Sequence, residues 1–116
     1  MIWIEIISIR TAGIIEAEKV FEFCRHMFQS ITDEDLLKLT LFCSAKYPTD
    51  ISIHLKWKSD SGSGSILGRE MTSALSDFGL INHTVWIERG KFITGAPSEI
   101  SNANTLQGDL RPSSSA

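Results

Sequence analysis

The chain has 116 residues, of which 42% are hydrophobic and 22% charged, and its formal net charge at pH 7 is −3. These values fit one globular domain that is long enough to bury a core without disulfides or metal ions. A weakly acidic chain lacks the general basic character that attracts nucleic acids and anionic lipids. No apolar run approaches the roughly 18 residues of a membrane span, and no basic leader precedes the first apolar run. We therefore expect a cytoplasmic protein with neither nucleic acid nor membrane as a partner.

The first two predicted elements are a strand and a helix. Ile2–Arg10 is rich in β-branched residues and apolar on both faces, which is typical of a central strand covered on both sides. Ile14–Ser30 has apolar residues at spacings of three and four, as in a helix that buries one stripe. The stripe consists of Ala17, Val20, Phe21, Cys24, Met27, Phe28 and Ile31. We expect Phe21, Cys24 and Phe28 to pack on the sheet.

Two strands follow, joined by a hairpin loop at Pro48. Leu36–Ser44 and Ile51–Lys58 both alternate between apolar and polar side chains. The crossover Ser59–Ser65 then leads to a second helix, Ile66–Asp77, which Gly79 is expected to end. The last predicted strand is His83–Arg89.

This βαββαβ order is that of the ferredoxin-like α+β fold, with a four-stranded antiparallel sheet and two helices on one face. We expect the domain to occupy residues 1–92. Residues 93–116 are rich in Ser, Asn, Gly and Pro, and we expect them to form a polar tail.

The sheet face without helices is the main functional question. Regular alternation puts the Leu and Ile residues of the middle strands under the helices, together with Val85 and Ile87. The other face is then expected to carry Trp3, Ile7, Ile9, Thr40, Phe42, His54, Trp86 and Glu88. Such a face is too apolar to stay in water.

This face could be buried in three ways. A second copy could pack its sheet against it and close an α/β barrel, which is the expectation we favour. The tail could fold over it instead, or its aromatic side chains could stack nucleic-acid bases. The last alternative is disfavoured because Lys38, Lys56 and Lys58 are offset by Glu5 and Glu88, and because the third strand lacks the RNA-recognition signature.

The strand order, the aromatic sheet face and the long last strand resemble the dimeric α/β-barrel superfamily, which includes antibiotic-biosynthesis monooxygenases and haem-degrading enzymes. The resemblance covers about residues 1–92. It implies the ferredoxin-like fold, a homodimer and a space between two sheets. The Asn, His and Trp used by the haem-degrading branch have no matching set here, so no catalytic residue is carried over.

The candidate ligand-binding residues are His54, Trp86, Trp3 and Phe42. His54 is a titratable group expected on the apolar face, and the three aromatic side chains would form the walls. The alternative for His54 is a hydrogen bond across the dimer, and for the aromatic residues plain packing.

Other chemistry is less well supported by the sequence. The three histidines lie on separate elements without metal-ligand spacing, so we expect no metal and no cofactor. The glycines from Gly62 to Gly68 fit neither the dinucleotide fingerprint nor the P-loop, and a linker is favoured. Cys24 and Cys43 both fall on apolar sides and are expected to be reduced core thiols; a disulfide or a reactive thiol is the alternative.

The expected function is that of a homodimer which binds a small apolar or aromatic molecule in a cavity on the sheet face. A cofactor-independent monooxygenase-like enzyme and a purely structural or regulatory association domain are the alternatives. No motif identifies a reaction, so the sequence supports an enzyme no more than a non-catalytic domain.

Overall fold

The computed structural model describes residues 1–59 and 63–95 of the chain. The elements are β1 (Ile2–Thr11), α1 (Ile14–Ser30), β2 (Leu36–Cys43), β3 (Asp50–Lys58), α2 (Ile66–Leu75), a 3₁₀ turn (Ser76–Phe78) and β4 (Gly79–Ile87). The strands form one antiparallel sheet in the order β2–β3–β1–β4. The predicted ferredoxin-like α+β fold is therefore confirmed.

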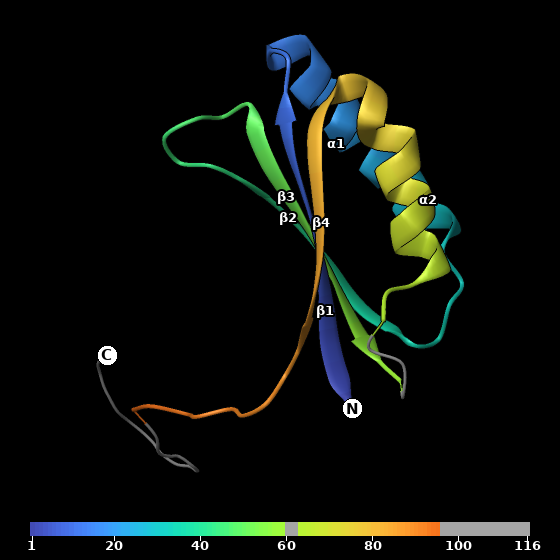
Figure 1. The fold of residues 1–116 in the computed structure, drawn as a ribbon, viewed down its shortest axis with the longest axis vertical. Coiled ribbons are helices and arrows are strands. Elements are labelled where there is room, and N and C mark those ends of the chain that lie inside the picture. Colours follow the sequence, from blue (N-terminus) through green and yellow to red (C-terminus); the bar gives the residue numbers. More distant parts are fainter. Residues whose placement is uncertain (60–62, 96–116) are drawn as a thin grey trace.

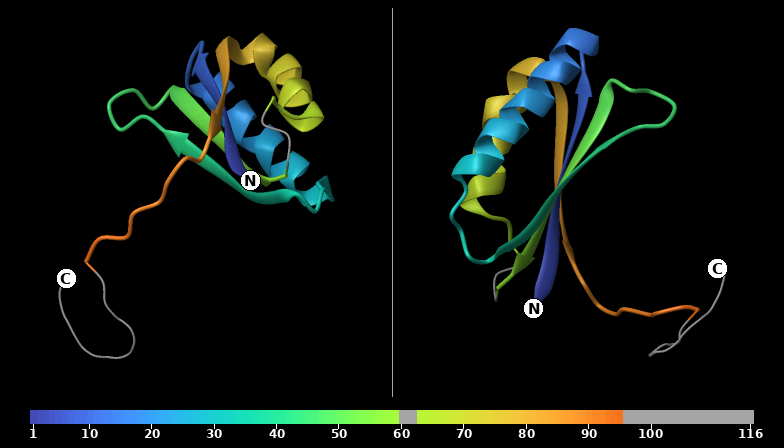
Figure 2. Two further views of the ribbon diagram at one scale, coloured as in Figure 1. Left: turned by 60° about the horizontal axis from the view of Figure 1, so that its bottom comes forward. Right: turned by 180° about the vertical axis from the view of Figure 1, so that it is seen from behind.

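Both helices lie on one side of the twisted sheet, and no described helix covers the other side (Figure 1, Figure 2). We call the uncovered side the open face. On the helix side, β1 and β3 bury every second residue, and α1 and α2 add small and medium apolar side chains. The hydrophobic core consists of Trp3, Ile7, Ile9, Ala17, Val20, Cys24, Ile51, Ile53, Leu55, Trp57, Met71 and Leu75.

The expected orientation of β1 is wrong. Trp3, Ile7 and Ile9 were assigned to the open face, but they pair in register with Trp57, Ile53 and Ile51 and are buried under the helices. Both faces of β1 are apolar, so alternation alone could not decide which face points inward. The residues of β1 on the open face are Ile2, Ile4, Ile6, Ser8 and Arg10.

A bulge changes the start of β2. Leu36 pairs with Trp57 and Lys38 with Lys56, so Leu37 is an extra residue between them. Leu37 was expected under the helices, but it is half exposed. Beyond the bulge the expected alternation holds, with Leu39 and Leu41 on the helix side.

Two further core assignments are corrected at the outer edge of the sheet. Phe28 was expected to be buried, but its side chain remains 57% exposed near the end of α1. Cys43 ends β2 and is exposed. Cys24 is buried as expected, and burial raises the pKa of its thiol to about 11.

The last strand starts earlier and ends earlier than expected. Gly79 was predicted to end the second helix, but it is the first residue of β4 and pairs with Thr11. A Cβ atom at this position would lie 2.1 Å from the carbonyl oxygen of Arg10. Glycine is therefore needed because two backbones approach closely, not because a helix ends there.

The chain beyond β4 runs away from the sheet on the side opposite the helices (Figure 1, Figure 2). We call residues 88–95 the arm. Of the predicted tail, only residues 93–95 are described, and residues 96–116 lie outside the described part. Within the described residues, no helix is both long and apolar enough to cross a membrane.

Candidate functional site: the open face of the sheet

The pairing register arranges the open face in rows that cross all four strands. Ile6 of β1 lies between His54 of β3 and Thr84 of β4, and Thr40 of β2 lies beyond His54. One row toward the β2–β3 hairpin consists of Asn82, Ser8, Ser52 and Phe42. The next row on the side away from the hairpin consists of Trp86, Ile4, Lys56 and Lys38. The face is thus apolar along β1 from Ile2 to Ile6, polar at Ser8, and mixed along the other strands.

His54 and Phe42 come together in the structure. Their ring centroids are 4.7 Å apart, with the planes tilted by 56°. The ring nitrogen Nε2 of His54 also lies 2.9 Å from the hydroxyl oxygen of Ser52. Because this serine holds Nε2, the His54 ring is oriented before any ligand arrives. Of the four residues predicted from the sequence, these two form one cluster.

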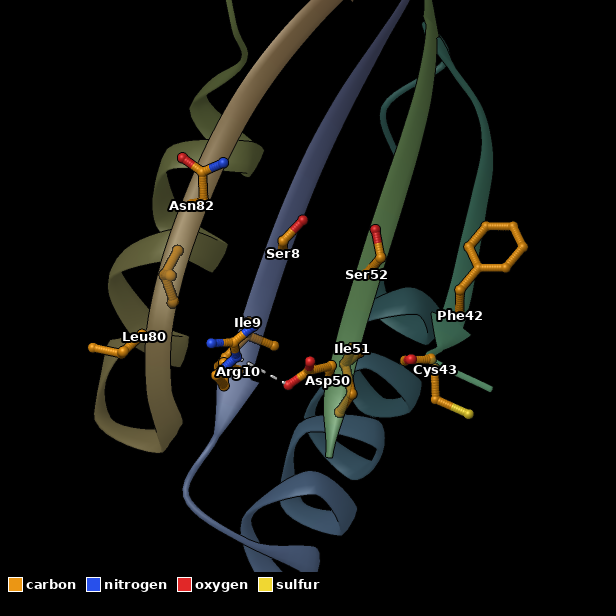
Figure 3. A pocket seen from close by; sticks show the side chains of 12 residues that line it. Ser8, Ile9, Arg10, Phe42, Cys43, Asp50, Ile51, Ser52, Leu80 and Asn82 are labelled. Atoms are coloured by element: carbon orange, nitrogen blue, oxygen red, sulfur yellow. Dashed lines mark ion pairs between the residues drawn. The ribbon is translucent and has the colours of Figure 1, made fainter. Parts of the chain in front are cut away.

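A hollow of about 470 Å³ opens beside this cluster, toward the hairpin end of the sheet. Figure 3 shows the side chains of Ser8, Ser52, Phe42 and Asn82 standing on the open face around it. The ion pair between Arg10 and Asp50, 3.4 Å long, lies at the end of the hollow. Apolar walls with a few hydroxyl and amide groups are typical of small-molecule sites. Sequence reasoning missed Ser8 and Asn82, because the wrong orientation of β1 hid Ser8 and the last strand was expected to start after Asn82.

Trp86 and Trp3 do not join this cluster. Trp86 is on the open face, 59% exposed, and its indole Nε1 donates to the hydroxyl of Thr84 at 2.9 Å. It is on β4, whereas His54 is on β3 with β1 between them. Trp3 is under the helices, 2% exposed, and stacks on Trp57 with centroids 5.6 Å apart. Trp3 therefore cannot line a site on the open face.

The charge on the open face also differs from the sequence-based expectation. Lys38 and Lys56 lie directly opposite each other in the row that contains Trp86, and Lys58 is on the same face of β3. Glu5 was expected to offset them, but it is fully buried on the helix side. This end of the open face is therefore more basic than the sequence suggested.

Burial lowers the pKa of His54 below its ordinary value of 6.5, because removing water disfavours the charged imidazolium. The ring is therefore neutral at physiological pH. In this form it offers one nitrogen as a donor and one as an acceptor.

This shift predicts a pH dependence of folding. Because the pKa is lower in the folded chain, the unfolded chain binds the proton more readily just below pH 6.5. The contribution of His54 to stability is therefore complete above 6.5 and is lost as the pH falls below it. Urea unfolding at about pH 7.5 and about pH 5 should show a larger drop for wild type than for His54→Asn. His26→Asn, at an exposed position of α1, is the control and should behave like wild type. Equal drops in stability for wild type and His54→Asn would contradict a lowered pKa of His54 in the folded chain.

A second polar cluster lies on the helix side, and sequence reasoning missed it. Oε1 of Glu5 accepts hydrogen bonds from Trp57 Nε1, at 2.8 Å, and from the Ser65 hydroxyl. Oε2 accepts from the Ser65 backbone amide at 3.0 Å and lies 2.9 Å from His83 Nε2. The carboxyl group is 0% exposed and sits against Gly68, where a Cβ atom would lie only 2.2 Å from Oε2. The cluster thus ties the start of α2 to β1, β3 and β4.

The three histidines lie on separate parts of the described structure. His26 is on α1, His54 on the open face and His83 on the helix side of β4. Across residues 1–59 and 63–95, no three His, Cys, Asp or Glu side chains are grouped as metal ligands would be.

Comparison with solved structures identifies the fold. The chain superposes on a conserved protein from Methanosarcina mazei Go1 with a TM-score of 0.61 and 11% identity, over 77% of this chain and 94% of the other. It superposes on SnoaB, a cofactor-independent oxygenase from Streptomyces nogalater, with a TM-score of 0.56 and 14% identity, over 78% and 95%. This chain therefore shares the ferredoxin-like fold of these proteins.

A third structure with this fold contains a ligand. It is the monooxygenase from the gene ActVA-Orf6 of Streptomyces coelicolor in complex with nanaomycin D, with a TM-score of 0.57 and 16% identity over 83% of this chain and 92% of the other. No family model matches the chain. No curated protein matches it either. At these identities the likeness confirms the resemblance in fold and carries no residue role across.

Proposed function

We propose that the protein is a homodimer which packs its open faces together and binds a small aromatic or apolar molecule between them. The observation that carries the proposal is the hollow lined by Phe42, Ser52 and Asn82, because it combines apolar walls with hydroxyl and amide groups. His54 does not line it but contacts Phe42 and Ser52, which do. A second sheet packed over this hollow would shield it from water, as sites for small molecules require.

The exposed apolar residues of the open face support association. Phe42 is 49% exposed, Trp86 59% and Leu80 77%, and all three project from the same face. Together with Ile2, Ile4 and Ile6 of β1 they make this face more apolar than the surface of most monomeric proteins. A sheet-to-sheet interface would remove them from water at about 25 cal/mol per Å² of apolar area.

We expect a dimer at micromolar concentration in sedimentation experiments, and Trp86→Asp should shift the chain toward the monomer. The reason is that the substitution removes a large exposed apolar side chain from the proposed interface and puts there a carboxylate, which loses water when a second sheet packs on it. Ile66→Asp is a matched control, because Ile66 is 69% exposed but lies at the start of α2, on the helix side. A wild-type chain that stays monomeric would contradict the proposal.

Ligand binding is tested on the same proteins. A screen of neutral and anionic bicyclic aromatic compounds should find binding to wild type that is weakened by His54→Ala and by Asn82→Leu. Anionic compounds are included because Lys38 and Lys56 share the open face. Compounds that bind wild type and both variants equally would place the ligand elsewhere, and a dimer that binds none would favour the association domain.

The likeness in fold to SnoaB favours an oxygenase as the second candidate. Such an enzyme would consume oxygen with a reduced aromatic substrate and without an added cofactor. Oxygen uptake with any compound found in the screen, and its loss in His54→Ala, would support this candidate over simple binding.

A further inference from the structure

Ser52 and His54 form a hydrogen-bonded pair on the open face whose chemistry goes beyond binding. They are two residues apart on β3, so both side chains project from the same face of the sheet. The Ser52 hydroxyl oxygen and Nε2 of His54 are 2.9 Å apart. At this distance an imidazole nitrogen can take the proton of a serine hydroxyl as its oxygen attacks an electrophile. The pair therefore has the geometry of a nucleophile and its general base.

The surroundings of His54 keep its ring able to accept that proton. The side chains directly opposite it or packed on it are uncharged, namely Ile6, Thr40 and Phe42. Lys56 and Lys38 occupy the next row and are positive, so neither stabilises a protonated ring. Arg10 and Asp50 lie two rows away in the other direction and pair with each other. The neutral ring that follows agrees with the lowered pKa of His54.

The hollow beside Ser52 offers hydrogen-bond donors to a carbonyl oxygen. Ser8 is directly opposite Ser52 on β1, and Asn82 is directly opposite Ser8 on β4 (Figure 3). All three line the hollow. Directly opposite residues of antiparallel strands have Cβ atoms about 5 Å apart, so a carbonyl group bonded to Ser52 Oγ would have its oxygen within reach of the Ser8 hydroxyl. Donors placed in this way stabilise negative charge that develops on oxygen.

Phe42 indicates which kind of substrate fits. It is directly opposite Ser52 on β2, lines the hollow and is 49% exposed, so an aromatic group bound beside Ser52 would pack on its ring. Among the described residues, no carboxylate is hydrogen-bonded to His54, so the pair lacks the acidic member of a full triad. Such a pair suits an ester whose leaving group departs as a weakly basic phenolate rather than an amide.

We propose that the protein hydrolyses aryl esters in this hollow, with Ser52 as the nucleophile and His54 as the general base. Ser52 Oγ bonds to the ester carbonyl carbon, and its proton passes to Nε2 of His54. The bond to the phenol oxygen then breaks, and Nε2 gives the proton to that oxygen. Water attacks the acyl group on Ser52 in the same manner, which releases a carboxylic acid and restores the hydroxyl. The proposal rests on the hollow of the proposed function but uses one chain only, so it does not require the dimer.

The first test is covalent labelling with phenylmethanesulfonyl fluoride, whose ring fits beside Phe42. Ser52 Oγ should displace fluoride, and peptide mass spectrometry should locate the sulfonyl group on Ser52. The label should be absent in Ser52→Ala and should form about 100-fold more slowly in His54→Asn. Ser73→Ala, at an exposed position of α2, is the control and should label like wild type. A label on a different serine, or equal labelling rates in wild type and His54→Asn, would overturn the proposal.

Hydrolysis of p-nitrophenyl acetate gives a readout that a merely structural role for His54 would not move. Because the base must be neutral, kcat/KM should be constant above pH 6.5 and fall below it as His54 takes up a proton. Ser52→Ala should lower kcat/KM about 100-fold or more, with an unchanged circular dichroism spectrum. His26→Asn, at an exposed position of α1, should keep the wild-type profile. Hydrolysis that Ser52→Ala leaves unchanged would overturn the proposal.

These measurements separate ester hydrolysis from the proposed binding and dimerisation. A wild-type chain that binds an aromatic compound in the hollow, but neither takes the label at Ser52 nor hydrolyses the ester, would overturn ester hydrolysis and leave the binding function in place. A monomeric chain that is labelled at Ser52 with the expected dependence on His54 would support ester hydrolysis and contradict the homodimer.

Discussion

Replacing Glu5 by alanine is expected to lower the free energy of unfolding by about 3–5 kcal/mol, because it breaks a buried, hydrogen-bonded charge cluster. The change leaves the indole N–H of Trp57 and the backbone N–H of Ser65 without their acceptor. It also empties the space against Gly68 that the carboxylate now fills. Each buried donor left unpaired costs about 1–3 kcal/mol.

Two further variants make this result specific. Glu5→Gln keeps the shape of the side chain but turns an amide nitrogen toward hydrogen-bond donors. We therefore expect a smaller loss of stability than for Glu5→Ala. Glu22→Ala removes an exposed carboxylate paired with Arg25 and should change stability by about 0.5 kcal/mol or less. Urea unfolding at one fixed protein concentration gives the free energies of unfolding of wild type and the three variants for comparison. A loss below about 1 kcal/mol for Glu5→Ala would mean that the carboxyl group is not enclosed.

Replacing Trp3 by alanine should cost a similar amount, about 3–5 kcal/mol. The side chain is 2% exposed, stacks on Trp57, and donates from Nε1 to the Ser59 hydroxyl at 2.9 Å. Removing it leaves a large void in the core beneath the helices.

The same substitution distinguishes the two orientations of β1. If Trp3 were on the open face, its removal would weaken the dimer and leave the unfolding of each chain largely unchanged. Trp3→Phe is the matched variant, since it keeps a stacked ring and loses mainly the hydrogen bond, at about 1 kcal/mol. For both variants, sedimentation measures the strength of the dimer and urea unfolding measures the stability of the chain. A weaker dimer without loss of chain stability in Trp3→Ala would contradict the structure.

The sequence predicted the parts of the fold where a single periodicity dominates. β3 alternates cleanly between Ile or Leu and polar residues, so its two faces, and with them His54, were assigned correctly. The stripe of α1 was recognised as well, with Val20 and Cys24 buried as expected. In these elements the apolar positions of the sequence coincide with the buried positions of the structure, so the pattern was enough to assign the faces.

The predictions were wrong where the local sequence pattern fits two orientations of the same element. β1 is apolar on both faces, and Glu5 was assigned with Trp3 to the face without helices. Glu5 instead finds its partners in Trp57, Ser65 and His83, which are 52, 60 and 78 residues away in the sequence. No local signal reports such partners, because burial of a charge is decided by tertiary contacts. The bulge at Leu37 and the exposure of Phe28 are likewise set by the packing of the edge strand.

The buried carboxylate also limits what α2 can do. The start of a helix attracts anions, because its first backbone N–H groups lack partners within the helix. Here the position is already taken by an anion from the same chain, since Glu5 accepts from the backbone amide of Ser65, and the Ser65 hydroxyl accepts from Gly68 at 2.8 Å. A phosphate group would have to displace a side chain held by four contacts before it reached these amides. The glycine-rich crossover therefore precedes a helix that carries its own internal counter-ion, and nucleotides are poor candidates for this end of the molecule.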